Sequence, residues 1–192
     1  YRKTSIASLN NVIDHCGLIS ECFPEQSSSP ILVVNVGGWN QDGFVGLDGK
    51  QKSYSLLKES LASVKTSNIQ LAIQTMPPFP WHFGGQSFHN LFVDPKEIRA
   101  FCEETGYKVC LDVSHSMMAC NYYGWSLDSF IDEIKEHISY LHVVDALGSD
   151  GEGIQIGEGD VNFNELGHAL NAACPDAPFI PEIWQGHKDK GA

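Results

Sequence analysis

The sequence lacks four features that would each indicate a particular class of protein. No apolar stretch approaches the roughly 20 residues that cross a bilayer, and the first residues lack the apolar core of a signal peptide. Its six cysteines show no CxxC spacing, which disfavours a zinc knuckle or a disulfide framework and favours reduced thiols. No GxGxxG motif follows a predicted strand, so a dinucleotide-binding fold is poorly supported. We therefore expect a cytoplasmic protein.

Positive charge is also scarce. Twelve basic residues oppose 24 acidic ones, which gives a formal net charge of -12. An acidic surface repels phosphate backbones and anionic lipids. We expect neither nucleic acid nor a membrane as a partner.

The chain is long enough to bury one sizeable core. It has 192 residues, 42% of them hydrophobic, and its composition does not divide into two distinct halves. We therefore expect a single domain over residues 1–192.

Five short apolar runs alternate with stretches of helical spacing. Strict alternation of strands and helices requires parallel pairing through right-handed crossovers, which predicts an α/β fold with a parallel sheet. A complete (β/α) TIM-type barrel has eight strands in about 250 residues. The chain also starts without methionine and ends soon after its last run, so we expect only the C-terminal five strands of such a barrel. The runs are 31 to 36, 69 to 73, 108 to 111, 139 to 144 and 178 to 180.

Helix signals lie between these runs. Residues 5 to 22 have helical spacing, a long loop is expected to about Gln51, and a helix with Tyr54 follows it. Asp94 and Ser126 are expected to cap the next two helices, and Asn162 the last one.

Each run ends in polar residues that are able to bind a metal ion or a sugar. The carboxyl ends of parallel strands open on the same face, so these residues are expected to converge into one polar cluster. They are Asn35, Gln74, Asp112 with His115, His142 with Asp145, and Glu182.

Four short motifs carry a resemblance to a known family. From about Ile31 to Ala192 the chain resembles the xylose-isomerase-like barrel family, which includes sugar and sugar-phosphate isomerases and epimerases and, more distantly, endonuclease IV-type enzymes. The motifs are Leu111-Asp112-Val113-Ser114-His115, Leu141-His142-Val143-Val144-Asp145, Ile156-Gly157-Glu158-Gly159-Asp160 and Pro181-Glu182-Ile183-Trp184.

The resemblance implies a site for one divalent metal ion. By matched motif, its ligands would be Gln74, Asp112, His142 and Glu182. Oxygen ligands with one imidazole suit Mn²⁺, Mg²⁺, Co²⁺ or Zn²⁺, and the ion would polarise a substrate carbonyl. Glu182 would also be the catalytic base, and His115 would assist catalysis at the substrate oxygens.

Further residues are candidates for binding the substrate. Asp145 would orient His142 or bind substrate. The aromatic loop after Gln74 either stacks on a sugar or packs as a lid, since aromatic faces serve both purposes. Glu152 and Glu158 are expected to be structural or solvated. The other substrate-binding candidates are Asn35, Trp81, Gln86, Trp184 and His187.

The sequence departs from the family at two places. Gln74 replaces a glutamate that is a metal ligand and, in epimerases, one of two proton-transfer bases. A glutamine oxygen can coordinate a cation, but the amide cannot accept and return a proton near neutral pH. Asn35, Gly151 and Gly153 stand where endonuclease IV-type enzymes have zinc ligands, which argues against DNA repair.

These observations leave two functional hypotheses. The first is a metal-dependent isomerase or epimerase acting on a small-molecule sugar or sugar phosphate, by proton abstraction next to a carbonyl. The alternative is a non-catalytic carbohydrate-binding or accessory barrel domain of a longer protein. Exposed edges of a partial sheet would favour a homo-oligomer or fusion to further domains.

Overall fold

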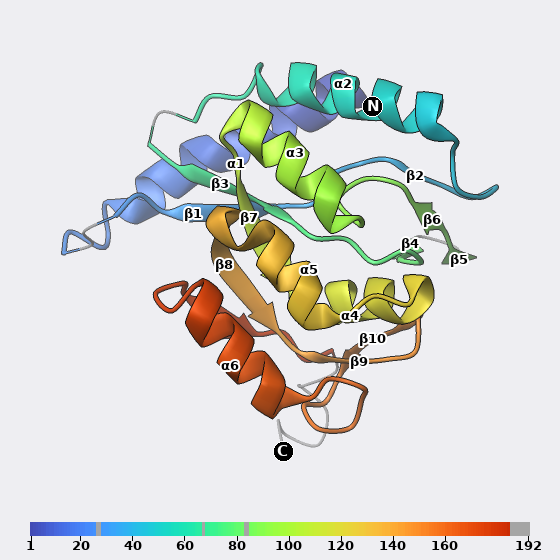
Figure 1. Ribbon diagram of the computed structural model, residues 1–192. Coiled ribbons are helices and arrows are strands. Elements are labelled where there is room, and N and C mark those ends of the chain that lie inside the picture. Colours follow the sequence, from blue (N-terminus) through green and yellow to red (C-terminus); the bar gives the residue numbers. More distant parts are fainter. Residues whose placement is uncertain (26–27, 67, 83–84, 185–192) are drawn as a thin grey trace.

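A curled parallel sheet of five strands forms the centre of the protein (Figure 1). The computed structural model describes residues 1–25, 28–66, 68–82 and 85–184. The strand order is β1-β3-β7-β8-β11, and every neighbouring pair is parallel. The predicted α/β fold with part of a TIM-type barrel is therefore confirmed. The strands are β1 (Ile31–Val34), β3 (Gln70–Gln74), β7 (Lys108–Asp112), β8 (Ile138–Val143) and β11 (Phe179–Pro181).

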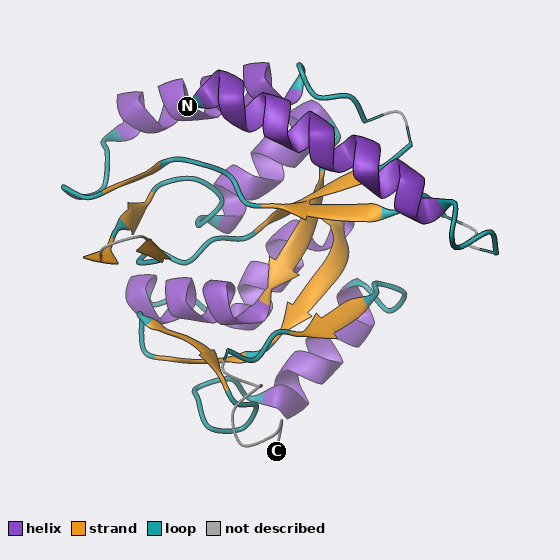
Figure 2. Cartoon of the chain, turned by 180° about the vertical axis from the view of Figure 1, so that it is seen from behind, coloured by secondary structure: helices purple, strands orange, loops and turns teal. Residues whose placement is uncertain are grey.

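Helices and three small two-stranded ribbons surround this sheet (Figure 2). None of the helices in the described part of the chain is long and apolar enough to cross a membrane. The helices are α1 (Arg2–Ser20), α2 (Leu47–Leu61), α3 (Pro95–Thr105), α4 (Val113–Tyr123), α5 (Leu127–Ile134) and α6 (Phe163–Ala173), with a 3₁₀ turn at Lys135–His137. The ribbons pair β2 (Trp39–Asn40) with β6 (Phe88–His89), β4 (Trp81–His82) with β5 (Gly85–Gln86), and β9 (Asp145–Leu147) with β10 (Gly151–Ile154).

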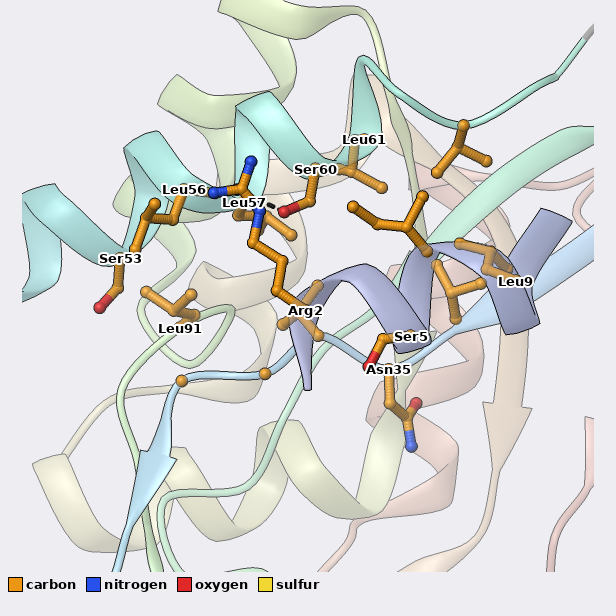
Figure 3. A pocket seen from close by; sticks show the side chains of 16 residues that line it. Arg2, Ser5, Leu9, Asn35, Ser53, Leu56, Leu57, Ser60, Leu61 and Leu91 are labelled. Carbon is orange, nitrogen blue, oxygen red and sulfur yellow. Dashed lines mark hydrogen bonds between the residues drawn. The ribbon is translucent and has the colours of Figure 1, made fainter.

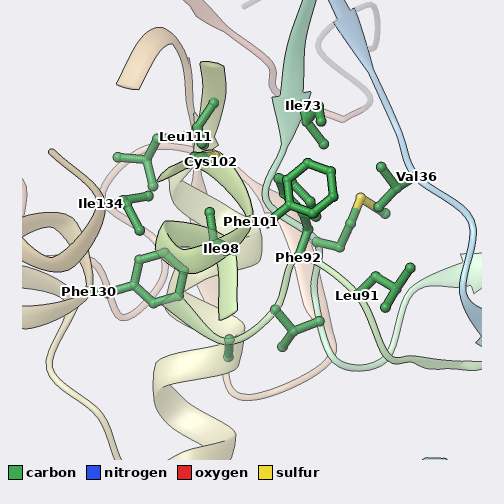
Figure 4. Packing of buried hydrophobic residues seen from close by; sticks show 14 of the residues in the cluster. Val36, Ile73, Leu91, Phe92, Ile98, Phe101, Cys102, Leu111, Phe130 and Ile134 are labelled. Carbon is green, nitrogen blue, oxygen red and sulfur yellow. The ribbon is translucent and has the colours of Figure 1, made fainter. Parts of the chain in front are cut away.

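The hydrophobic core lies between the sheet and the helices that cover it. Ile73 of β3 and Leu111 of β7 are fully buried, as expected for central strands covered on both faces. Ile98 of α3 lies between Phe130 of α5 and Phe92 of the preceding loop (Figure 4). These contacts fix the strands whose ends carry the polar residues.

Local signals set several helix boundaries. The Asp94 side chain accepts a 2.8 Å hydrogen bond from the Lys96 N–H, and Gly106 ends α3 in the left-handed conformation. Ser126 and Asn162 cap α5 and α6 as predicted. Two boundaries differ: α1 is Arg2–Ser20 rather than 5 to 22, and α2 begins at Leu47, inside the segment predicted to be a loop.

Several elements lie where the sequence patterns predicted none, and two of them border the polar residues at the strand ends. Helix α4 begins directly after β7, with Asp112 as both the last strand residue and the helix cap. Its buried side chains do not form one stripe, so no helical periodicity was visible. The glycine-containing segment at 151–154, predicted to be loop, pairs with β9 as an antiparallel ribbon.

Candidate functional site

Four polar side chains from successive strand ends meet on one face of the sheet. Gln74 ends β3, Asp112 ends β7, and His142 lies near the end of β8 directly opposite Asp112. Glu182 follows β11, and its N–H donates to the Val143 carbonyl at 3.4 Å. The structure therefore brings together the four residues that were predicted from separate motifs.

The distances within this group are those of a connected polar cluster. His142 Nδ1 lies 2.5 Å from Glu182 Oε2 and 3.5 Å from Asp112 Oδ2. Single ligand atoms of Asp112, His142 and Glu182 all lie within 4.8 Å of one another. Two carboxylates and one imidazole in this arrangement are a typical donor set for a divalent cation.

Gln74 contacts this cluster through its amide nitrogen. Gln74 Nε2 donates to Asp112 Oδ2 at 2.7 Å and lies 3.2 Å from His142 Nδ1. An amide nitrogen is a donor, so Gln74 could act as a metal ligand only with its amide turned to present the oxygen.

Asp112 is held in its ionised form despite complete burial. Burial alone would raise the pKa of this carboxyl, but the His115 charge and the hydrogen bonds from His142, the His115 N–H and Gln74 outweigh it. The pKa of Asp112 is therefore below its usual value. A buried carboxylate without enough partners would be costly, and these contacts stabilise it.

His115 lies beside the cluster in the first turn of α4. Its Nδ1–H donates to the Thr75 carbonyl at 2.7 Å, and its Nε2 lies 2.8 Å from Glu152 Oε1. Burial lowers the pKa of His115, but the charges of Asp112 and Glu152 and the hydrogen bonds to Glu152 and the Thr75 carbonyl raise it to about 9. Contacts at both ring nitrogens fix the imidazole.

Glu152 is a member of the site that sequence reasoning missed. It was expected to be structural or solvated, yet its side chain is only 12% exposed and contacts His115 from β10. Its position belongs to none of the four motifs. Gly151 and Gly153, on either side of Glu152, were the one sequence signal for a close backbone approach here. The fold shows that this approach is to Leu147 and Trp184.

A cavity of about 170 Å³ lies beside this cluster, and Gln74, Asp112 and Glu182 line it together with His115 and Glu152. The predicted residues Asn35 and Trp184 also line it. The full lining is Asn35, Gln74, Asp112, Ser114, His115, Val144, Glu152, Gly153, Glu182 and Trp184.

Asp145 has a different position from the predicted one. It is fully buried, and its two oxygens accept hydrogen bonds from the N–H groups of Ala146, Gly157, Gly159 and Val161 at 2.8 to 3.0 Å. These bonds use the acceptor capacity of the carboxylate. Asp145 therefore anchors the loop before α6 and does not line the cavity.

The remaining candidates lie elsewhere. Gln86 is exposed on β5 and does not line the cavity. Trp81 pairs with it through the backbone, but the Trp81 side chain and the whole of His187 lie outside the described residues.

A second, larger hollow of about 330 Å³ lies between α1, α2 and the end of β1 (Figure 3). Leucines such as Leu56 and Leu57 contribute to its wall, and the Asn35 side chain points away from the two helices. Its lining in the described part of the chain contains Arg2 but no carboxylate or imidazole. Among the described residues, the group of side chains placed to hold a metal ion together lies at the smaller cavity.

Fold and site together define a class: part of a TIM-type barrel with its polar cluster at the carboxyl ends of the strands. Residues 28–192 match the family model described as xylose isomerase-like TIM barrel, and the chain belongs to that family. No curated protein matches the chain.

Solved structures share the fold at low sequence identity. A xylose isomerase domain protein from Planctomyces limnophilus is 12% identical, with a TM-score of 0.64, over 94% of this chain and 59% of its own. An L-ribulose 3-epimerase is 18% identical, with a TM-score of 0.58, over 80% and 48%. Endonuclease IV from Thermus thermophilus is 18% identical, with a TM-score of 0.61, over 96% and 63%. The chain thus spans about half to two thirds of the length of these proteins, and the likeness shows the fold alone.

Proposed function

We propose that this chain carries the metal site of a sugar isomerase in which Glu182 is the only proton-transfer base. The observation that carries the proposal is the convergence of Asp112, His142 and Glu182 at three neighbouring strand ends. Sugar epimerases among the structural neighbours support the substrate class.

The residues present fit a divalent cation. Asp112 is ionised inside the protein, and Glu182 and His142 already lie in contact. These three side chains would hold the ion, with Gln74 as a fourth ligand after its amide turns. A bound divalent cation supplies positive charge that polarises a carbonyl oxygen and makes the neighbouring C–H more acidic.

The side chains determine which proton transfers are available. The Glu182 carboxylate is 47% exposed and lines the cavity, so it can take a proton from carbon and return it to the adjacent carbon. The Gln74 amide cannot do the same on a second face. One base suffices for exchange between an aldose and a ketose, whereas inversion at a carbon requires transfer on two faces. The site therefore favours isomerisation over epimerisation.

The test is proton exchange in D₂O, followed by NMR, with Mn²⁺ or Co²⁺ and a panel of aldoses and ketoses. Wild type should incorporate deuterium next to the carbonyl and convert one sugar into the other. Glu182→Gln should lower the rate by about 10²- to 10⁴-fold, the usual contribution of a general base. Glu165→Gln, an exposed glutamate on α6, is the matched control and should behave as wild type.

The second candidate function is sugar binding without chemistry. The hydrogen bond from the Gln74 amide to Asp112 favours it, because this bond occupies a carboxylate oxygen that a cation would need. A sugar that binds wild type but exchanges no deuterium would support this function and exclude the isomerase.

A further inference from the structure

Glu152 is a largely buried carboxylate of the cavity, 12% exposed, that the proposed metal cluster does not use. The ribbon that carries it is fixed on two sides. The Gly153 N–H donates to Ser114 Oγ at 3.2 Å, and the Trp184 N–H donates to the Gly153 carbonyl at 3.1 Å. Glu152 is therefore held between the first turn of α4 and the segment that follows Glu182.

The glycines around Glu152 allow this close approach. A Cβ at Gly151 would lie 2.4 Å from the Leu147 carbonyl oxygen, and one at Gly153 would lie 2.4 Å from the Trp184 ring. Gly153 also has φ +71°, which L side chains rarely adopt. The position of Glu152 is thus built into the backbone.

Glu152 also retains capacity to bind a ligand. Its Oε1 accepts from His115 Nε2–H at 2.8 Å, whereas an ionised carboxylate offers about four acceptor positions on its two oxygens. Sugar hydroxyl groups are donors that a carboxylate binds strongly.

The charge of the cavity indicates which sugars it can accept. Its described lining includes the carboxylates of Asp112, Glu152 and Glu182 but neither lysine nor arginine. A phosphate or carboxylate group on the ligand would face these like charges. His115, the one imidazole among the described lining residues, has both ring nitrogens bonded to Thr75 and Glu152, so it has no free N–H to bind such a group.

We propose that Glu152 selects an uncharged sugar: its carboxylate binds neighbouring hydroxyl groups and repels phosphorylated analogues. The inference rests on the proposed function only in that the cavity binds a sugar, with or without turnover. Glu152 is a specificity-determining residue in this account and takes no part in proton transfer.

The test is calorimetric titration of the whole chain, with Mn²⁺ present, using D-fructose against D-fructose 6-phosphate and D-xylulose against D-xylulose 5-phosphate. Wild type should bind at least one free sugar about tenfold or more tightly than its phosphate. Glu152→Gln should weaken binding of that free sugar by about 10- to 100-fold, as expected for a lost hydrogen bond to a charged group. In Glu152→Gln, the affinity for the free sugar should also exceed that for its phosphate by a smaller factor than in wild type.

Two further variants separate charge from position. Glu152→Asp keeps the charge and should still reject the phosphates. Glu158→Gln changes an exposed glutamate six residues away and should match wild type. Melting curves for all variants establish that each is folded.

Equal or tighter binding of the phosphates by wild type would overturn the proposal. Unchanged sugar binding in folded Glu152→Gln, or no binding of either sugar by wild type, would overturn it as well. A free sugar that depends on Glu152 but is never converted would leave this proposal standing and refute the isomerase alone.

Discussion

At the scale of single residues, Gln74 is the side chain on which the proposed chemistry depends. Its amide donates to the buried Asp112 carboxylate and so compensates part of its charge. A glutamate there would offer a second base but would place two carboxylates in contact. Such a pair cannot both ionise without a cation between them.

Gln74→Glu should therefore make stability depend on metal. Without metal, we expect the free energy of unfolding to fall by about 1–3 kcal/mol, the usual cost of leaving a buried polar group without its partner. Added Mn²⁺ should restore it and raise the melting temperature more than in wild type, because ligand binding stabilises the folded state. Melting curves with EDTA and with Mn²⁺ measure both effects.

Gln70→Glu, at the other end of β3, is the matched control, and its melting temperature should not acquire this metal dependence. If Gln74→Glu melts like wild type under both conditions, Gln74 does not lie in a metal site.

The strand-end rule predicted which residues would meet. Four residues lie near or just after the carboxyl ends of predicted strands, and the fold brings their side chains together: Gln74, Asp112, His142 and Glu182. Asp145 also follows such a run, but its oxygens bind loop amides, and no sequence pattern distinguishes these two uses of a carboxylate. Glu152 lies outside the motifs, so only tertiary structure reveals its contact with His115.

At the scale of elements, β10, which pairs with β9 as a ribbon, contributes Glu152 and Gly153 to the wall of the cavity. The sequence predicted a loop here because two short strands with glycines show no alternation of apolar and polar residues. Its position depends on backbone contacts with Ser114 and Trp184, which are remote in sequence.

Gly153→Ala should destabilise the protein and displace Trp184 from the cavity. A left-handed backbone costs a non-glycine residue about 1–2 kcal/mol, and the new Cβ would also overlap the Trp184 ring. Gly148→Ala is the matched control, because Gly148 has φ +62° but no neighbouring atom within 4 Å of an added Cβ. Chemical denaturation and tryptophan fluorescence measure the two effects.

The difference between the two variants isolates the Trp184 contact. Gly153→Ala should lose more stability than Gly148→Ala, and only Gly153→Ala should change the fluorescence. Equal losses with identical spectra would contradict the packing of Trp184 against β10.

At the scale of the whole molecule, the sheet of the described chain has two open edges. Strands β1 and β11 each pair with one neighbour, whereas closure of a barrel leaves no edge. Alternation of strands and helices was sufficient to predict the parallel sheet, and the spacing of five runs was sufficient to predict its extent. Helix α4 was not predictable in this way, because it is buried on most sides.

The open edge at β11 predicts association of the chain with itself. Phe179 and Ile180 are 65% and 46% exposed there, and an exposed apolar edge favours pairing. Phe179→Lys should lower the apparent mass at high concentration in analytical ultracentrifugation, because charge on an edge opposes pairing. Leu47→Lys, which changes an exposed leucine on α2, should leave the mass unchanged. A wild-type chain that stays monomeric at all concentrations would contradict this prediction.

Metal content shows whether Asp112, His142 and Glu182 hold a divalent cation. Wild type and Asp112→Asn should be purified without chelator, reloaded with Mn²⁺ or Co²⁺, dialysed and measured by elemental analysis. Asparagine keeps the oxygen that caps α4 but removes the charge, so the variant should fold. Wild type should contain about one ion per chain, and Asp112→Asn should lose it. No ion in wild type after reloading, or equal content in the variant, would contradict it.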